Sequence, residues 1–106
     1  MTDKRKPTYD LDAFKAAFSQ PDRLNITTRA TLSAAGLGFG RVEISAIIQT
    51  MLREHFYKSM TSKANYKVWQ DVYHVPSEVG VLYVKFMADT MTDFRLLSFK
   101  EKEDHG

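Results

Sequence analysis

Residues 56–73 read FYKSMTSKANYKVWQDVY, and within this stretch the hydrophobic pattern of the chain changes. Upstream, apolar residues recur at the spacing of one helix face, whereas from Phe56 onward they tend to alternate, as they do in a strand. The stretch also sets aromatic rings among lysines. It predicts two strands, Phe56–Thr61 and Tyr66–His74, joined by a short polar connection, and it divides the chain into a helical half and a sheet half.

Three helices are predicted before this stretch. Their expected extents are residues 11–18 after a cap at Asp10, residues 28–35 after a cap at Thr27 or Thr28, and residues 41–52. Pro21 ends the first helix, and Leu24–Thr27 reads as a short extended piece. The link Gly36–Gly40 resembles a glycine-rich phosphate loop, but it follows a helix and lacks the full spacing of such loops. We therefore expect a tight turn between two helices there.

Two further strands are predicted downstream, at Val79–Ala88 and Phe94–Lys100. The connections are short and rich in turn-forming residues, which indicates an antiparallel meander. Helices grouped first and strands second predict an α+β fold of two layers, with the N-terminal helices packed on one face of a mainly antiparallel sheet. We expect a single domain over residues 1–106, with flexible ends at residues 1–8 and 103–106.

Composition excludes several classes of protein. The chain has 106 residues and no cysteine, and its three histidines lie far apart in the sequence, so we expect neither a disulfide framework nor a metal or other cofactor. The sequence shows no apolar run of a signal peptide or a membrane span, which predicts a soluble, cytoplasmic protein without a membrane partner. A net charge of +2 is compatible with a nucleic-acid partner but does not require one.

Alternation separates an inward from an outward set of side chains in the last two predicted strands. The inward set is Leu82, Val84, Phe86, Ala88, Leu97 and Phe99, and the outward set is Val81, Tyr83, Lys85, Met87, Ser98 and Lys100. Parity does not place Lys58, because it shares its parity with Phe56 and Met60. The strand that holds Gln70 mixes polar and apolar residues on both faces, so its orientation stays open.

The outward set allows two interpretations. Lysines beside aromatic rings suit single-stranded nucleic acid, since the charges follow the phosphates and the rings stack on bases. A polar sheet face with lysines is also what a two-layer domain commonly shows to water, where lysines protect sheet edges. The pattern alone favours the second interpretation.

Three sequence blocks change this balance: F-Y-K-S-M at residues 56–60, W-Q-D-V-Y at 69–73 and S-F-K-E-K at 98–102. In this order they resemble the bacterial toxin family of the motility quorum-sensing regulator. The resemblance implies a RelE-like α+β fold and a metal-independent endoribonuclease that cuts single-stranded messenger RNA, with a preference for GC-containing triplets. It also implies a cognate antitoxin with a zinc-binding N-terminal domain and a helix-turn-helix DNA-binding domain.

Carried over position by position, the resemblance places the catalytic residues at Lys58, Gln70, Tyr83 and Lys100. Alternation had already placed Tyr83 and Lys100 on the outward face. Contacts with RNA are expected from Lys58, Lys100, Lys85 and His74. His74-Val75-Pro76 stands where the family pattern has an arginine directly before a proline, so a basic phosphate contact is either lost or replaced by His74. The polar loop 89–93 also departs from the pattern.

The chemistry of these side chains suggests their roles. Metal-independent cleavage uses the 2′-hydroxyl as an internal nucleophile, and two lysines near one phosphate would stabilise the developing charge. Gln70 cannot titrate and is expected to position an oxygen by hydrogen bonds. The general base stays open, with Tyr83 as the first candidate. Trp69 and Tyr73 are expected to be packing residues.

Two other functions remain open at this stage. One is a nucleic-acid-binding regulator of the same fold without catalysis. The other is an interaction module whose exposed edge strand pairs with a partner. The joint presence of the two lysines, the glutamine and the tyrosine favours the enzyme, because a binding module needs charge but not this set.

Overall fold

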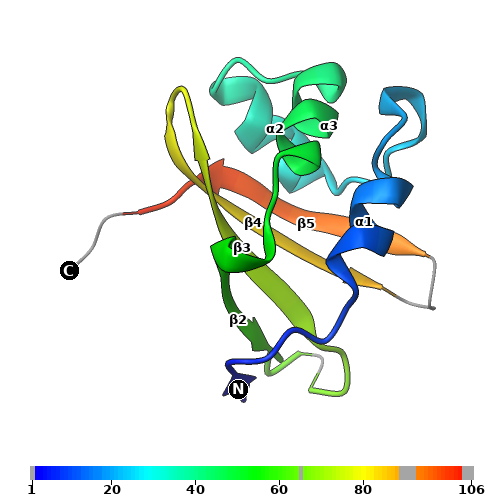
Figure 1. Ribbon diagram of the computed structural model, residues 1–106, viewed down its shortest axis with the longest axis vertical. Coiled ribbons are helices and arrows are strands. Elements are labelled where there is room, and N and C mark those ends of the chain that lie inside the picture. The colour runs from blue at the N-terminus through cyan, green and yellow to red at the C-terminus, as the bar shows by residue number, and fades with distance from the viewer. Residues whose placement is uncertain (1, 65, 89–92, 104–106) are drawn as a thin grey trace.

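Within the residues that the computed structural model describes, which are 2–64, 66–88 and 93–103, three α-helices lie on one side of a five-stranded antiparallel sheet (Figure 1). The helices are α1 (Leu11–Ala17), α2 (Thr28–Gly36) and α3 (Arg41–Gln49), with short 3₁₀ turns η1 (Pro21–Arg23) and η2 (Arg53–His55). The strands are β1 (Asp3–Lys4), β2 (Phe56–Met60), β3 (Gln70–Ser77), β4 (Gly80–Ala88) and β5 (Phe94–Glu101). The predicted α+β fold and meander are confirmed.

The helix termini form where the sequence predicts capping residues. The Asp12 N–H donates to Asp10 Oδ1 at 2.9 Å, and the Ala30 N–H donates to Thr27 Oγ1 at 3.1 Å, so Thr27 is the cap of α2. The link Gly36–Gly40 is the predicted turn between helices, and Gly38 takes a φ of 89° that favours glycine.

Helix α3 ends at Gln49 instead of the predicted Leu52. Beyond it, the Thr50 and Met51 N–H groups donate to carbonyls only three residues back, and Met51 is fully buried. The Met51 carbonyl accepts from Lys15 Nζ at 2.9 Å. The chain therefore leaves the helix to place Met51 in the core against α1.

Strand β3 lies further along the chain than predicted, starting at Gln70 instead of Tyr66 and ending at Ser77 instead of His74. The Trp69 carbonyl accepts a hydrogen bond from the Tyr9 hydroxyl at 2.7 Å, and the Trp69 ring has Lys4 Nζ 4.2 Å from its centroid. Trp69 thus packs against the N-terminal segment ahead of the ladder. At the other end, Ser77 pairs with Gly80 and closes the hairpin to β4.

A register shift corrects the predicted orientation of Leu97. Phe86 pairs with Leu96 but Lys85 pairs with Ser98, so one extra residue is inserted in β5. Leu96 is fully buried and Leu97 is only half-buried, which makes Leu96 and not Leu97 the inward residue. Parity is restored after the shift, so the predictions for Phe99 (buried) and Lys100 (exposed) are correct.

The N-terminal segment makes contacts that the sequence did not predict. Asp3 and Lys4 pair with Met60 and Ser59 as a fifth strand. Thr8 and Tyr9 donate their N–H groups to the buried carboxylate of Asp71, at 2.9–3.1 Å. The expected flexible C-terminal end and the divergent loop fall partly on residues 104–106 and 89–92, which are outside the described residues.

The hydrophobic core lies between the helices and the sheet. The Phe14 ring of α1 stacks on the Phe86 ring of β4, with centroids 3.7 Å apart and planes 3° from parallel. The extended piece before α2 forms a parallel bridge from Ile26 to Leu96, so it covers part of the β5 edge. Among the described residues, no single helix has the length and apolar character needed to cross a membrane, although α2 and α3 together, with a 92° bend, reach that length.

Candidate active site on the outer sheet face

The register of β3 decides which face its side chains take. Asp71 and Tyr73 pair with Phe86 and Val84, which belong to the buried core. Alternation then sends Gln70, Val72 and His74 to the opposite face, away from the helices, which we call the outer face. The orientation of Gln70, which the sequence left open, is thereby settled.

A β-bulge in β2 decides the orientation of Lys58. Phe56 pairs with Tyr73, but Lys58 pairs with Val72, so Tyr57 is the extra residue. Phe56 packs edge-on against Tyr73 in the interior, whereas Tyr57 stacks on the His74 ring with centroids 4.3 Å apart. The bulge therefore brings Tyr57 and Lys58 to the outer face together.

Two cross-strand rows result on this face. The first is Tyr57, His74, Tyr83 and Lys100, and the second is Lys58, Val72, Lys85 and Ser98. Val72 is fully buried although it lies outside the core cluster, so neighbouring side chains keep water from the centre of the outer face. Five of the predicted site residues, at positions 58, 74, 83, 85 and 100, thus fall in two adjacent rows.

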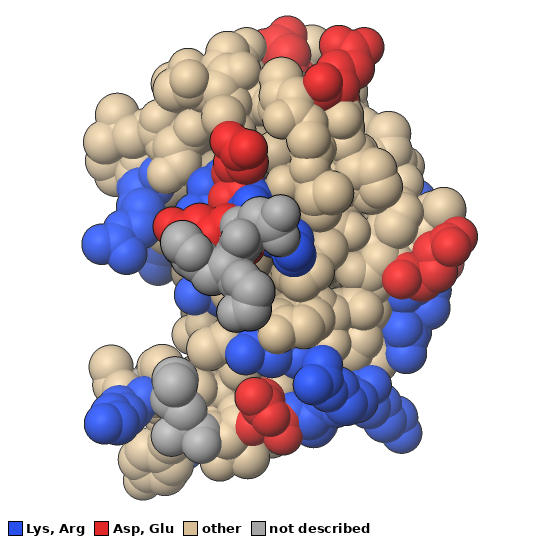
Figure 2. Space-filling model, turned by 90° about the vertical axis from the view of Figure 1, so that its left-hand side faces the viewer, with Lys and Arg blue, Asp and Glu red and all other residues tan. Residues whose placement is uncertain are grey.

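The first row lines an open depression of about 580 Å³, together with Lys102 and Glu103. The Lys100 Nζ lies 5.3 Å from the Tyr83 ring centroid. Figure 2 shows the side of the molecule from which the C-terminal segment leaves, with a hollow flanked by basic side chains. The depression therefore offers aromatic surfaces beside positive charge, a combination that binds single-stranded nucleic acid.

The surroundings move the pKa values of three groups in these rows. Burial, reinforced by Tyr57, raises the pKa of the Tyr83 phenol. Burial lowers the pKa of His74, and the charges of Lys102 and Lys58 lower it further. Burial also lowers the pKa of Lys85, with added repulsion from Lys100, Arg29 and Lys58. At neutral pH the phenol keeps its proton and the imidazole is neutral.

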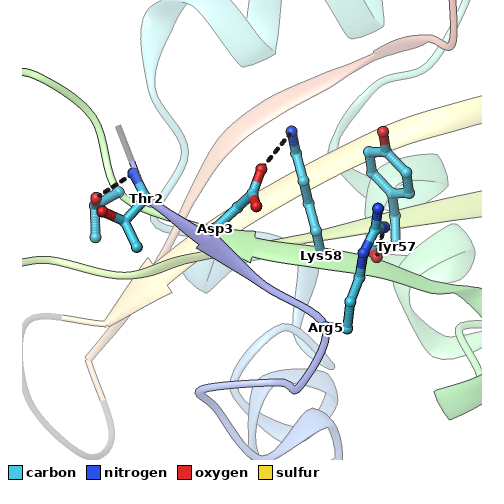
Figure 3. A network of polar contacts seen from close by, with 6 residues as sticks. Thr2, Asp3, Arg5, Tyr57 and Lys58 are labelled. Carbon is cyan, nitrogen blue, oxygen red and sulfur yellow. Dashed lines mark hydrogen bonds and ion pairs between the residues drawn. The ribbon is translucent and has the colours of Figure 1, made fainter.

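The N-terminal segment borders the site at Lys58 (Figure 3). Lys58 Nζ lies 3.7 Å from Asp3 Oδ2, and both side chains keep some exposure, 25% and 61%. Arg5 donates from Nη1 to the Tyr57 carbonyl at 3.2 Å and lies 5.5 Å from the centre of the Tyr57 ring. These two contacts place one acidic and one basic side chain beside the outer face.

Two comparisons with known proteins assign the chain to a family. The family model described as "Motility quorum-sensing regulator, toxin of MqsA" matches residues 6–101. The mRNA interferase toxin MqsR of Escherichia coli (strain K12) is 32% identical over 100 residues, which are 94% of this chain and 99% of that protein. The chain belongs to the motility quorum-sensing regulator toxin family. The resemblance drawn from the three sequence blocks is therefore confirmed, and the α+β arrangement is consistent with the RelE-like fold that it implied.

Not all of the residues carried over from the family pattern lie together in this toxin. Tyr83 and Lys100 pair directly, and Lys58 lies in the adjacent row. Gln70 pairs with Met60, which lies two residues beyond Lys58 in β2, and it does not line the depression. Gln70 thus lies on the outer face but outside the depression.

Five residues that border the site were not predicted from the sequence: Asp3, Arg5, Tyr57, Lys102 and Glu103. Tyr57 belongs to the F-Y-K-S-M block, but only the bulge places its ring on the outer face. Lys102 ends the S-F-K-E-K block but lies beyond the predicted strand Phe94–Lys100, and Arg5 lies in a segment that shows no periodicity. Among the described residues, no three His, Cys, Asp or Glu side chains lie close enough together to hold a metal ion.

Proposed function

We propose that this protein is the toxin of a toxin–antitoxin pair, and that it acts as an endoribonuclease on single-stranded messenger RNA. The relative from Escherichia coli carries the name of an mRNA interferase, which supports the activity. The observation that carries the proposal is the first outer-face row, where Tyr83 and Lys100 pair beside a stacked tyrosine and histidine in an open depression. A single domain over residues 1–106 would hold the whole site.

The proposed reaction needs only groups of the RNA and the protein. The 2′-oxygen of one nucleotide attacks the adjacent phosphorus, a bond forms between them, and the bond to the 5′-oxygen of the next nucleotide breaks. The product ends in a 2′,3′-cyclic phosphate. Lys100 and Lys58 contact the phosphate and stabilise the charge on its non-bridging oxygens, which is commonly the largest contribution to such catalysis. Lys85 adds a further cation in the adjacent row.

Tyr83 and Gln70 have different roles in this proposal. The raised pKa of Tyr83 keeps its proton in place, which favours the phenol as a donor to the leaving 5′-oxygen over the role of base that the sequence first suggested. Gln70 has both a donor and an acceptor and positions a neighbouring nucleotide from its place outside the depression.

The proposal includes the partner and the substrate preference that the family resemblance implies. The family description names MqsA as the partner of the toxin. We accordingly expect an antitoxin with a zinc-binding N-terminal domain and a helix-turn-helix domain that binds DNA. The expected cleavage sites are GC-containing triplets, and the expected compartment is the cytoplasm.

Incubation of the purified protein with a defined single-stranded RNA in EDTA tests the proposal. The wild type should give discrete fragments that end in 2′,3′-cyclic phosphate, and Lys58→Ala should leave the RNA intact. Intact RNA with the wild type, together with retention of that RNA in a gel shift, would contradict the enzyme and favour a regulator that binds nucleic acid without cutting it.

A further inference from the structure

His74 occupies the centre of the first outer-face row. It stacks on Tyr57 from β2, and its ring centroid lies 6.1 Å from that of Tyr83, its partner on β4. Stacking fixes the plane of the imidazole and leaves its nitrogens free at the ring edge, because they lie in that plane. Among the described residues, the ring of His74 makes these two aromatic contacts, and neither of its nitrogens has a hydrogen-bond partner. His74 is thus half-buried, oriented and available to a ligand in the depression.

Charged groups from several elements surround this imidazole. Lys58 lies in β2, Lys100 in β5 and Lys102 in the segment after β5, while Glu103 also lines the depression and Arg5 lies 5.5 Å from the centre of the Tyr57 ring. The burial of His74 and the charges of Lys102 and Lys58 favour the neutral imidazole. A neutral imidazole adds no positive charge for a phosphate, but one of its nitrogens is a free acceptor.

We propose that His74 is the general base of the ribonuclease, taking the proton of the attacking 2′-hydroxyl. This assignment rests on the proposed function and fills the role that the sequence left open. As the bond from the 2′-oxygen to phosphorus forms, its proton moves to the imidazole nitrogen. The Tyr83 phenol gives its proton to the departing 5′-oxygen, so protons and charges balance across the step.

The two pKa values support this division of roles. The surroundings lower the pKa of His74 and raise that of Tyr83, so the pair enters the reaction with a free acceptor and a retained proton. Two neighbouring groups whose environments separate their pKa values in this way are suited to be base and acid. The alternative, a histidine that only contacts phosphate, would need the charged form that the surrounding lysines disfavour.

Two substitutions of His74 separate a base from a phosphate contact. His74→Gln keeps the approximate size and a hydrogen-bonding tip but cannot take the proton, and we expect cleavage to fall by about 10²- to 10⁴-fold. Because the family pattern has an arginine in this segment, a base here is specific to this chain. His74→Arg introduces a fixed positive charge without a base and should remain as slow as His74→Gln. His55→Gln, in η2 and outside the depression, is the matched control and should keep the wild-type rate. Thermal unfolding checks that each variant is folded.

The pH profile gives a second readout. For the wild type, kcat/KM should rise with pH through a pKa below the ordinary value of 6.5 for histidine, and NMR titration of the free protein should assign that pKa to His74. The His74→Gln profile should lack this rise. An RNA with sulfur in place of the 5′-oxygen needs no proton on its leaving group, so it should restore Tyr83→Phe but not His74→Gln.

The outcomes distinguish this assignment from the proposed function. Suppose that the wild type cuts RNA. If His74→Arg is then as active as the wild type, or if His74→Gln keeps the rise of kcat/KM with pH, only the role of His74 is overturned. A wild type that leaves RNA intact would overturn the ribonuclease and this role with it. Slow cleavage by both His74 variants, with the rise in pH profile lost in His74→Gln, would support the assignment.

Discussion

Strand β3 carries two faces that differ in almost every physical respect. On the inner face Asp71, Tyr73 and Val75 are fully buried, whereas on the outer face Gln70 and His74 keep partial exposure. The block W-Q-D-V-Y therefore joins neighbours with separate tasks: Gln70 faces the proposed substrate side, and Asp71 holds the N-terminal segment. A short family motif can therefore contain both scaffold residues and site residues, and the face of the sheet on which each residue lies distinguishes the two.

The largest expected effect is on the inner face. Phe86→Ala removes the ring that stacks on Phe14 and leaves a cavity in the core, so we expect the free energy of unfolding to fall by about 3–5 kcal/mol. Val81→Ala, on the outer face of the same strand and 42% exposed, should change it by about 0.5 kcal/mol or less. Urea unfolding measures both. Similar losses in the two variants would contradict the division of β4 into two faces.

The next effect is on the outer face and concerns activity. Lys100→Ala should lower cleavage by about 10²- to 10³-fold, because it removes a cation from the phosphate in the transition state. The exposed side chain of Lys100 makes its loss nearly neutral for stability. Lys6→Ala is the matched control, since Lys6 is exposed and borders a groove beside α1. A Lys100→Ala protein that cuts RNA at the wild-type rate would remove Lys100 from the site.

Asp71 and Gln70 are neighbours in one motif of β3, and substituting each of them compares the inner with the outer face. Asp71→Ala leaves the N–H groups of Thr8 and Tyr9 without their acceptor and should cost about 1.5–3 kcal/mol of stability. Gln70→Ala should lower cleavage without a comparable loss of stability. Thermal unfolding and RNA cleavage, measured on both variants, test whether Asp71 acts on stability and Gln70 on cleavage. Equal effects of the two substitutions in both assays would argue against separate tasks.

A pH dependence of the inner face is expected only at alkaline pH, and near neutral pH it is absent. Burial, with a contribution from Asp71, raises the pKa of Tyr73 to about 12 from its ordinary value of 10.0. Both states keep the proton below pH 10, but above it the unfolded chain loses the proton first. The free energy of unfolding should therefore decrease between pH 10 and 12, by up to about 2–3 kcal/mol.

Tyr73→Phe is the control for this dependence. Within the described residues the Tyr73 hydroxyl has no hydrogen-bond partner, so its removal should cost little at pH 7. The substitution should also remove most of the decrease between pH 10 and 12. Urea unfolding at pH 7, 10 and 12 tests both expectations. An unchanged decrease in the variant would assign it to other groups.

The sequence predicted the parts of this fold that depend on regular local periods. Strand β4 alternates cleanly, so the outward positions of Tyr83 and Lys85 could be read directly. The helix caps were also predictable, since Asp10 and Thr27 carry side-chain acceptors at the start of apolar patterns. Both signals depend on residues that are close together in the sequence, so they can be read without knowledge of the tertiary structure.

The parts that could not be predicted depend on irregularities or on distant contacts. Single extra residues in β2 and β5 bring Tyr57 to the outer face and bury Leu96 instead of Leu97, and alternation carries no sign of them. The orientation of Gln70 needed the pairing of β3 with the core of β4. The N-terminal segment binds Asp71 across more than sixty positions, 63 for Thr8, which no periodic pattern can indicate.

RNA is expected to bind the outer face alone, and NMR mapping with an uncleavable substrate tests this directly. The probe is a single-stranded RNA in which the nucleotide at the mapped cleavage site lacks its 2′-hydroxyl. We predict side-chain signal shifts that alternate along β3, at Gln70 and His74 but not at Tyr73 or Val75, together with shifts at Tyr83 and Lys100. Shifts confined to the helix-covered side would contradict binding at the outer face, and cleavage of the RNA that lacks this 2′-hydroxyl at the native rate would contradict 2′-hydroxyl attack.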